Sequence, residues 1–89
     1  VGQAAENAFM ARGSSIKAGI PYEATALTVN RLCSSGLQAI VTAAMEIDNG
    51  FCEIAVAGGG ESMNNIPYYL RKARSGYRMG HAELEDGLV

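Results

Sequence analysis

The clearest pattern in the chain is a helical period that follows Cys33 and stops at Gly50. Apolar residues recur there every three or four positions, and polar residues fill the opposite face. The apolar positions are Leu37, Ile40, Val41, Ala44 and Met45, and the polar positions are Gln38, Thr42, Glu46 and Asn49. Gly50 is placed to end the element, because glycine commonly follows the last helical residue. The pattern predicts an amphipathic helix that buries one face.

Two β-rich runs flank this helix, at residues 24–30 and 53–57. Neither alternates cleanly between apolar and polar positions, which favours strands that are buried on both faces. The triplet Gly58-Gly59-Gly60 ends the second run. A strand, a helix and a strand in this order form a βαβ unit, which predicts parallel pairing through a right-handed crossover.

The two ends of the chain have a different character. Residues 3–18 favour a helix, with Gly19 as its C-terminal cap and Pro21 blocking its continuation. After Gly60 the periodicity is lost, and prolines, asparagines and paired tyrosines predict a loop-rich region rather than further sheet. We find no internal repeat and no low-complexity tract in the 89 residues.

Composition narrows the class of protein. A chain of 89 residues forms at most one small domain with a thin core. The net charge of −2 gives no basic excess for nucleic acid, and no apolar run approaches the ~20 residues of a membrane helix. The chain begins at Val1 and stops at Leu88-Val89, so we expect a piece of a longer protein.

Cys33 and Cys52 flank opposite ends of the predicted helix, which would be ~24 Å long at its ordinary rise per residue. A disulfide needs Cα atoms within about 7 Å, so we expect no bond between them. With no Cys-x-x-Cys pair and no His/Cys cluster, the sequence favours a reduced intracellular setting and no metal site.

Cys33 is the strongest candidate for chemistry, because it stands where a β-rich run turns into a helix. A helix N-terminus favours a thiolate, and strand-to-helix turns present nucleophiles to substrate carbonyls in other folds. The alternative is a buried, inert cysteine. The small residues Ser34, Ser35 and Gly36 would let a carbonyl approach backbone N–H groups, or either serine would cap the helix.

Two motifs at the correct separation resemble the thiolase family. The positions that match its acyl-enzyme signature are Val29, Asn30, Cys33, Ser34, Ser35, Gly36, Leu37, Ala39, Ile40 and Ile47. Downstream, the run from Val56 to Met63 is similar to the family's Gly-Gly-x-Glu-Ser-Met segment. The resemblance covers nearly the whole chain and is greatest to acetyl-CoA acetyltransferases.

This resemblance implies an α/β fold, namely a βαβ piece of a mostly parallel mixed sheet with a buried central helix. Residues 1–62 would be part of the N-terminal core domain, and residues 63–89 would begin an inserted loop domain. The parent would be a cytoplasmic homo-oligomer, a dimer or a tetramer, that binds acyl-CoA as its substrate. The resemblance implies no resident cofactor, and it assigns no coenzyme A contact to a particular residue. From the charge and hydropathy given above, we expect no nucleic acid and no membrane partner.

The same resemblance implies that Cys33 is the acyl-thioester nucleophile and that its backbone N–H contributes to an oxyanion hole. The reaction would be the Claisen condensation of two acetyl-CoA to acetoacetyl-CoA, or its reversal by thiolysis. The family's catalytic histidine lies in a Gly-His-Pro segment, whereas Gly80-His81-Ala82 lacks the proline. We therefore expect His81 to be a surface residue, and the catalytic histidine and the second cysteine to lie outside these residues.

Several alternatives remain open at this stage. A longer-chain 3-ketoacyl-CoA thiolase shares the run from Cys33 to Gln38, and a decarboxylating ketoacyl synthase is a weaker match. A non-catalytic structural or interaction fragment is the alternative from another class. The basic group Arg71, Lys72, Arg74 and Arg78 would attract coenzyme A phosphates, belong to an assembly loop or simply be solvated. The glycine triplet favours tight backbone packing beneath the nucleophile over a phosphate cradle.

Overall fold

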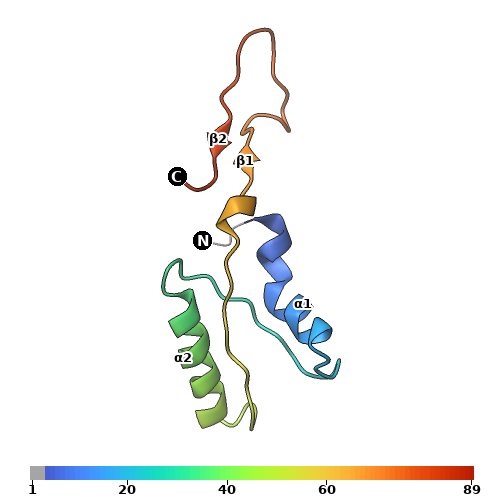
Figure 1. The fold of residues 1–89 in the computed structure, drawn as a ribbon, viewed down its shortest axis with the longest axis vertical. Coiled ribbons are helices and arrows are strands. Elements are labelled where there is room, and N and C mark those ends of the chain that lie inside the picture. Colours follow the sequence, from blue (N-terminus) through green and yellow to red (C-terminus); the bar gives the residue numbers. More distant parts are fainter. Residues whose placement is uncertain (1–3) are drawn as a thin grey trace.

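The chain forms two helices and a long hairpin, arranged along an extended molecule (Figure 1). The computed structural model describes residues 4–89. The elements are η1 (Ala5–Phe9), α1 (Met10–Lys17), α2 (Ser35–Asp48), η2 (Met63–Asn65), β1 (Tyr68–Tyr69) and β2 (Glu85–Asp86). The molecule measures 58 × 26 × 23 Å, and Ala4 is the one buried apolar residue among those described. A thin core was expected from the length of the chain, and among the described residues it amounts to Ala4 alone.

The predicted N-terminal helix is present as η1 followed by α1, although residue 3 lies outside the described residues. It ends as predicted at Gly19, whose φ of 84° is a conformation that glycine adopts readily. The amide of Ile20 donates to the carbonyl of Ser15, at 3.0 Å, which closes the C-terminal turn.

α1 is tied to the extended segment that follows it. The Arg12 guanidinium donates to the carbonyls of Ala24, at 2.6 Å, and Tyr22, at 3.1 Å. The amide of Ala11 donates to the hydroxyl of Thr28, at 3.1 Å. These bonds fix the course of the chain toward Cys33.

The second predicted helix is confirmed as α2, and Gly50 ends it with a φ of 75°. The predicted burial of its apolar face is wrong for this structure, because α2 contains no buried residue. Leu37 is 67% exposed and Ile40 57%. Among residues 4–89, no element packs across that face.

The two predicted strands do not form. Residues 24–30 and 53–57 lack strand hydrogen bonding, and Ile54 and Val56 are each 84% exposed. A strand exists only where a neighbouring strand accepts its backbone hydrogen bonds, and no described segment does so here. The predicted parallel βαβ pairing is therefore absent from the described residues, whose helices and one small sheet are compatible with the broader α/β class.

The only sheet in the described part of the chain is the antiparallel pair of β1 and β2. Tyr68 is opposite Asp86 and Tyr69 is opposite Glu85. The amide of Gly87 donates to the carbonyl of Pro67, at 3.2 Å, which extends the contact beyond the strands. The loop-rich character predicted after Gly60 is thus observed, with one short hairpin inside it. The division at residue 62/63 stays a prediction.

Candidate functional site

The chain turns sharply at Leu32, immediately before Cys33. Leu32 has a φ of 51°, and it is the only described residue other than glycine with a positive φ. This left-handed conformation is costly for a residue with a Cβ. The amide of Leu32 donates to the side-chain oxygen of Asn30, at 2.9 Å, which partly offsets that cost.

Backbone hydrogen bonds lead from this turn into α2. The amides of Ser34 and Ser35 donate to the carbonyls of Arg31 and Leu32, each at 3.1 Å. The amide of Gln38 then donates to the carbonyl of Ser34, at 2.9 Å. Cys33 therefore lies between the turn and the first residue of the helix.

The hydroxyl of Ser35 bridges two backbone groups of the turn. It accepts from the amide of Arg31, at 2.8 Å, and donates to the carbonyl of Leu32, at 2.6 Å. Helix capping by Ser34 or Ser35 was one of the alternatives left open by the sequence, but Ser34, at the N-cap position, makes no side-chain capping bond. Ser35 instead binds the backbone before the helix, so neither serine caps the helix in this structure.

A second connection runs along the helix surface. The guanidinium of Arg31 donates to the side-chain oxygen of Gln38, at 2.8 Å, and the Gln38 amide group donates to the hydroxyl of Thr42, at 3.0 Å. Residues 31 and 32 are therefore bonded to α2 at two places, at Ser35, the first residue of the helix, and at Gln38, one helical turn later.

Cys33 is an exposed free cysteine, whereas Cys52 is free and half-buried. The structure thus places Cys33 in the exposed position that the sequence predicted for a nucleophile. Because Ser34 makes no capping bond, the amides of Gly36 and Leu37 have no side-chain cap, as is usual for the first turn of an uncapped helix. An exposed thiol just before a helix that has no side-chain cap provides a nucleophile and a source of N–H donors for attack on a carbonyl.

The glycine triplet passes close to this turn. A Cβ built on Gly59 would lie 3.9 Å from the Cα of Gly36, which is ordinary van der Waals contact. The segments carrying the two family motifs are therefore in contact at this one point, and tight packing of the whole triplet beneath the nucleophile stays a prediction. Gly58 and Gly60 would meet nothing within 4 Å.

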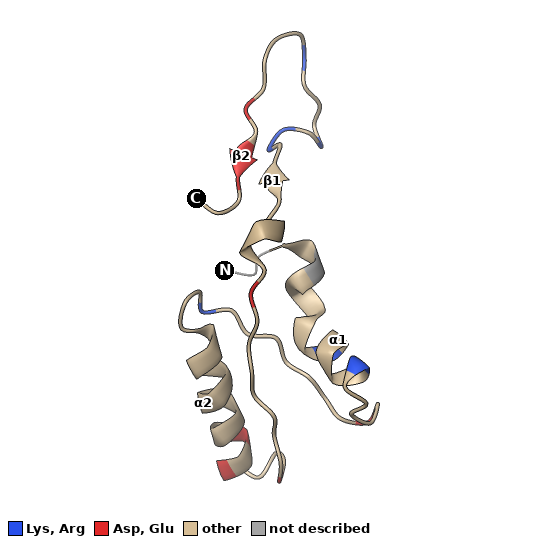
Figure 2. Cartoon of the chain, viewed as in Figure 1, with Lys and Arg blue, Asp and Glu red and all other residues tan. Residues whose placement is uncertain are grey.

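His81 and the basic group lie in the loop between β1 and β2, which extends away from both helices (Figure 1). His81 is exposed, as predicted, and the structure does not bring it to Cys33. Figure 2 shows the basic residues along the outgoing arm of this hairpin and the acidic ones on the returning arm. Arg71 and Glu85 form an ion pair between the arms, at 2.6 Å.

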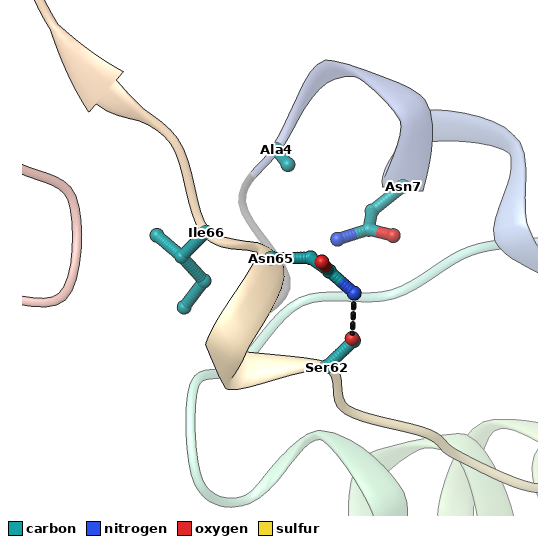
Figure 3. A pocket seen from close by; sticks show the side chains of 5 residues that line it. All are labelled: Ala4, Asn7, Ser62, Asn65 and Ile66. Atoms are coloured by element: carbon teal, nitrogen blue, oxygen red, sulfur yellow. Dashed lines mark hydrogen bonds between the residues drawn. The ribbon is translucent and has the colours of Figure 1, made fainter.

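A hollow of about 330 Å³ lies between the start of η1 and η2, and sequence reasoning missed it (Figure 3). Its lining residues are Ala4, Asn7, Ser62, Asn65 and Ile66. The side-chain amide of Asn65 donates to the hydroxyl of Ser62, at 2.6 Å. The Glu-Ser-Met motif was the one available signal, but it indicated a family rather than a hollow. No lining side chain is an acid or a base, and the one hydroxyl, that of Ser62, accepts the bond from Asn65.

Residues 4–89 bring together no group of three or more histidine, cysteine or acidic side chains that could hold a metal ion. Within the same range, neither helix has the length and apolar character needed to cross a bilayer.

Comparison with known proteins identifies the family. Residues 1–89 match the family described as thiolase, N-terminal domain. Acetyl-CoA acetyltransferase 2 of Arabidopsis thaliana is 47% identical over 79 residues, which are 89% of this chain and 20% of the relative. The acetyl-CoA acetyltransferase of Pseudomonas aeruginosa gives the same identity and coverage. Beta-ketothiolase BktB of Cupriavidus necator is 50% identical over 81 residues, 91% of this chain and 21% of the relative.

The chain thus spans about a fifth of the length of the curated relatives it matches. The match to the family covers every residue, including the turn at Cys33 and the glycine-rich segment beside it. The resemblance noted from the two motifs is confirmed. The chain belongs to the thiolase family, and its residues match that family's N-terminal domain.

Proposed function

We propose that this chain carries the nucleophile of an acetyl-CoA C-acetyltransferase. The observation that supports this most directly is the exposed thiol of Cys33, held at the turn into α2 in a chain that matches the thiolase N-terminal domain throughout. Curated relatives named acetyl-CoA acetyltransferase support the choice of acetyl-CoA as the substrate.

The proposed reaction has two halves. The Cys33 thiolate attacks the thioester carbonyl of acetyl-CoA, the carbonyl oxygen takes the negative charge, and collapse of that intermediate expels coenzyme A as its thiolate. The acetyl group then rests on the Cys33 sulfur as a second thioester, which remains activated because sulfur is a good leaving group. The backbone N–H of Cys33 would stabilise the oxyanion.

In the second half, the α-carbon of another acetyl-CoA loses a proton and attacks the acetyl group on Cys33. A carbon–carbon bond forms, the Cys33 thiolate leaves, and acetoacetyl-CoA is released; thiolysis is the reverse. The bases for these proton transfers would be the family's histidine and second cysteine, elsewhere in the parent protein.

A longer-chain 3-ketoacyl-CoA thiolase is the second candidate. It is favoured by the run from Cys33 to Gln38, which that group shares, and by the similarity to a relative named beta-ketothiolase. Comparing thiolysis rates of the parent on short and long 3-ketoacyl-CoAs separates the two. Equal or faster thiolysis of long chains would overturn the acetyl-specific assignment.

A non-catalytic role for the chain is tested by alkylation of the parent protein. We expect Cys33 to react with iodoacetamide at neutral pH faster than a free thiol, and acetyl-CoA to protect it. Half-buried Cys52 is the internal control and should react slowly in both conditions. A Cys33 that reacts no faster than a free thiol would remove the chemical basis of the proposal.

The remaining family properties are proposals of the same kind. We propose that residues 1–62 belong to the core domain and residues 63–89 begin the loop domain. The parent would be a homo-oligomer in the cytoplasm, although one relative is named as mitochondrial. The charged hairpin would then serve either subunit assembly or attraction of coenzyme A phosphates.

A further inference from the structure

We propose that Ser35 and Gln38 are positioning residues that hold the turn bearing Cys33 against the start of α2. This inference rests on the proposed role of Cys33 as the acyl-accepting nucleophile. Neither side chain is assigned a contact with the substrate. Their effect on acyl transfer would pass through residues 31 and 32, by way of the backbone for Ser35 and of the Arg31 side chain for Gln38.

Ser35 makes the tighter of the two connections. Its single hydroxyl satisfies the amide of Arg31 and the carbonyl of Leu32 at once, at 2.8 and 2.6 Å. These two groups flank the peptide bond that leads into the left-handed residue at φ 51°. Because that conformation is unfavourable for leucine, it persists only where surrounding bonds hold it. Removing the hydroxyl leaves both groups without this partner.

Gln38 makes the second connection. It accepts from the Arg31 guanidinium, at 2.8 Å, while its own amide group is oriented by the Thr42 hydroxyl, at 3.0 Å. Thr42 is one turn further along α2, so the helix itself supports this contact. Arg31 is thus held at its backbone by Ser35 and at its side chain by Gln38.

The position of this turn determines where the Cys33 sulfur and backbone N–H lie. Nucleophilic attack needs the sulfur near the carbonyl carbon and the donor near its oxygen in one arrangement. A displacement of about 1 Å can cost on the order of 100-fold in rate. A loosened turn should therefore slow acylation without preventing acyl-CoA from binding.

The test measures a single round of Cys33 acylation in the full-length parent. Enzyme is mixed with acetyl-CoA in a rapid-quench instrument, and coenzyme A release is followed together with acetyl on the Cys33 peptide. The amplitude of coenzyme A release measures the fraction of enzyme that is folded and reactive. The rate constant of acylation measures how well Cys33 is positioned. The variants are Ser35→Ala, Ser35→Thr, which keeps the hydroxyl, and Gln38→Leu. Ser34→Ala is the matched control, since that hydroxyl makes no capping bond.

We expect Ser35→Ala to lower the rate constant by about 10- to 100-fold at full amplitude and unchanged half-saturation by acetyl-CoA. Ser35→Thr should recover most of the rate, Gln38→Leu should lose a smaller factor, and Ser34→Ala should match the unsubstituted enzyme. A Ser35→Ala enzyme that loses only amplitude, or nothing, overturns the positioning role.

If Ser35→Ala does not fold, Gln38→Leu tests the positioning role by itself. An unchanged acylation rate constant in the Gln38→Leu enzyme also overturns the proposal. The unsubstituted enzyme separates this inference from the proposed function. If it forms no acetyl-Cys33, the assigned chemistry fails and the positioning role falls with it. If it forms acetyl-Cys33 and the variants keep its rate, only the positioning role fails.

Discussion

Leu32 bends the chain in front of the candidate nucleophile, in a backbone conformation that its side chain disfavours. Sequence reasoning located the turn from the change between a β-rich run and a helix, and it singled out Cys33 there. It could not identify the hydroxyl bridge of Ser35, because hydrogen bonds to an irregular turn depend on backbone angles that local residue preferences do not specify. The exposure of Cys33 agrees with its proposed role, which stays a proposal.

Substitution of Leu32 tests whether this turn is strained. Leu32→Val adds β-branching at φ 51°, and because leucine already bears the general cost of this conformation, we expect the free energy of unfolding of the parent to fall by only about 1 kcal/mol. Loss of packing contributes little, because Leu32 is 55% exposed. Urea titration measures the difference. Leu32→Asn is the control, since asparagine tolerates this conformation, and equal stabilities for the two variants would contradict the account.

Helices and strands differ in how far the sequence determines them. α1 and α2 were predictable because their hydrogen bonds are local and their ends are fixed by Gly19 and Gly50. The strands expected at residues 24–30 and 53–57 require partners distant in sequence, and the described residues supply none. The hairpin of β1 and β2 was not predicted, because a strand of two residues is too short to show an alternation of apolar and polar positions.

Arg12 tests the connection between α1 and the segment leading to Cys33. Arg12→Met keeps an apolar stem but removes both bonds to the carbonyls of Ala24 and Tyr22. A hydrogen bond from a charged group contributes about 1.5–3 kcal/mol to the free energy of unfolding. Because the two Arg12 bonds are partly exposed to solvent, we expect each to contribute less than this. We expect a loss of about 2 kcal/mol in the parent's free energy of unfolding. Lys17→Met, an exposed substitution on the same helix, should change it little, and equal effects would contradict the account.

Gly87 tests the packing of the hairpin. A Cβ there would collide with the carbonyl oxygen of Pro67 and the ring of Tyr69, and it would lie 2.9 Å from the Ile66 side chain. Gly87→Ala should therefore destabilise the parent by about 1–3 kcal/mol. Gly13→Ala is the matched control, because a Cβ at that helical position meets nothing within 4 Å. Alanine there should raise stability by up to about 1 kcal/mol, and effects of the same sign at both glycines would contradict this account.

The molecule as a whole exposes the apolar surfaces that a core would cover. Its long axis is 58 Å, and the apolar face of α2 and the segment around Ile54 are open. Composition predicted a small domain of ordinary hydrophobicity, but composition does not reveal which residues find a partner. The chain also spans about a fifth of its relatives' length. We therefore expect catalysis from the full-length parent, which would supply the remaining catalytic groups, and not from these residues alone.

The isolated 89 residues should accordingly show no steady thiolysis of acetoacetyl-CoA. Turnover needs one group to deprotonate coenzyme A and another to protonate the departing acetyl-CoA carbanion. His81 belongs to the loop between β1 and β2, and that loop extends away from α2 (Figure 1). The measurement follows loss of acetoacetyl-CoA in the presence of coenzyme A, with the parent as the positive control. Sustained turnover by residues 1–89 alone would contradict the proposed division of catalytic groups.

The most direct measurement is the site of acetylation in the parent enzyme. The enzyme is mixed with acetyl-CoA, quenched in acid and digested, and its peptides are examined by mass spectrometry. The account predicts one acetyl group on the peptide containing Cys33 and none on the peptide containing Cys52. Turnover with an unmodified Cys33, or with the acetyl group on another residue, would contradict it.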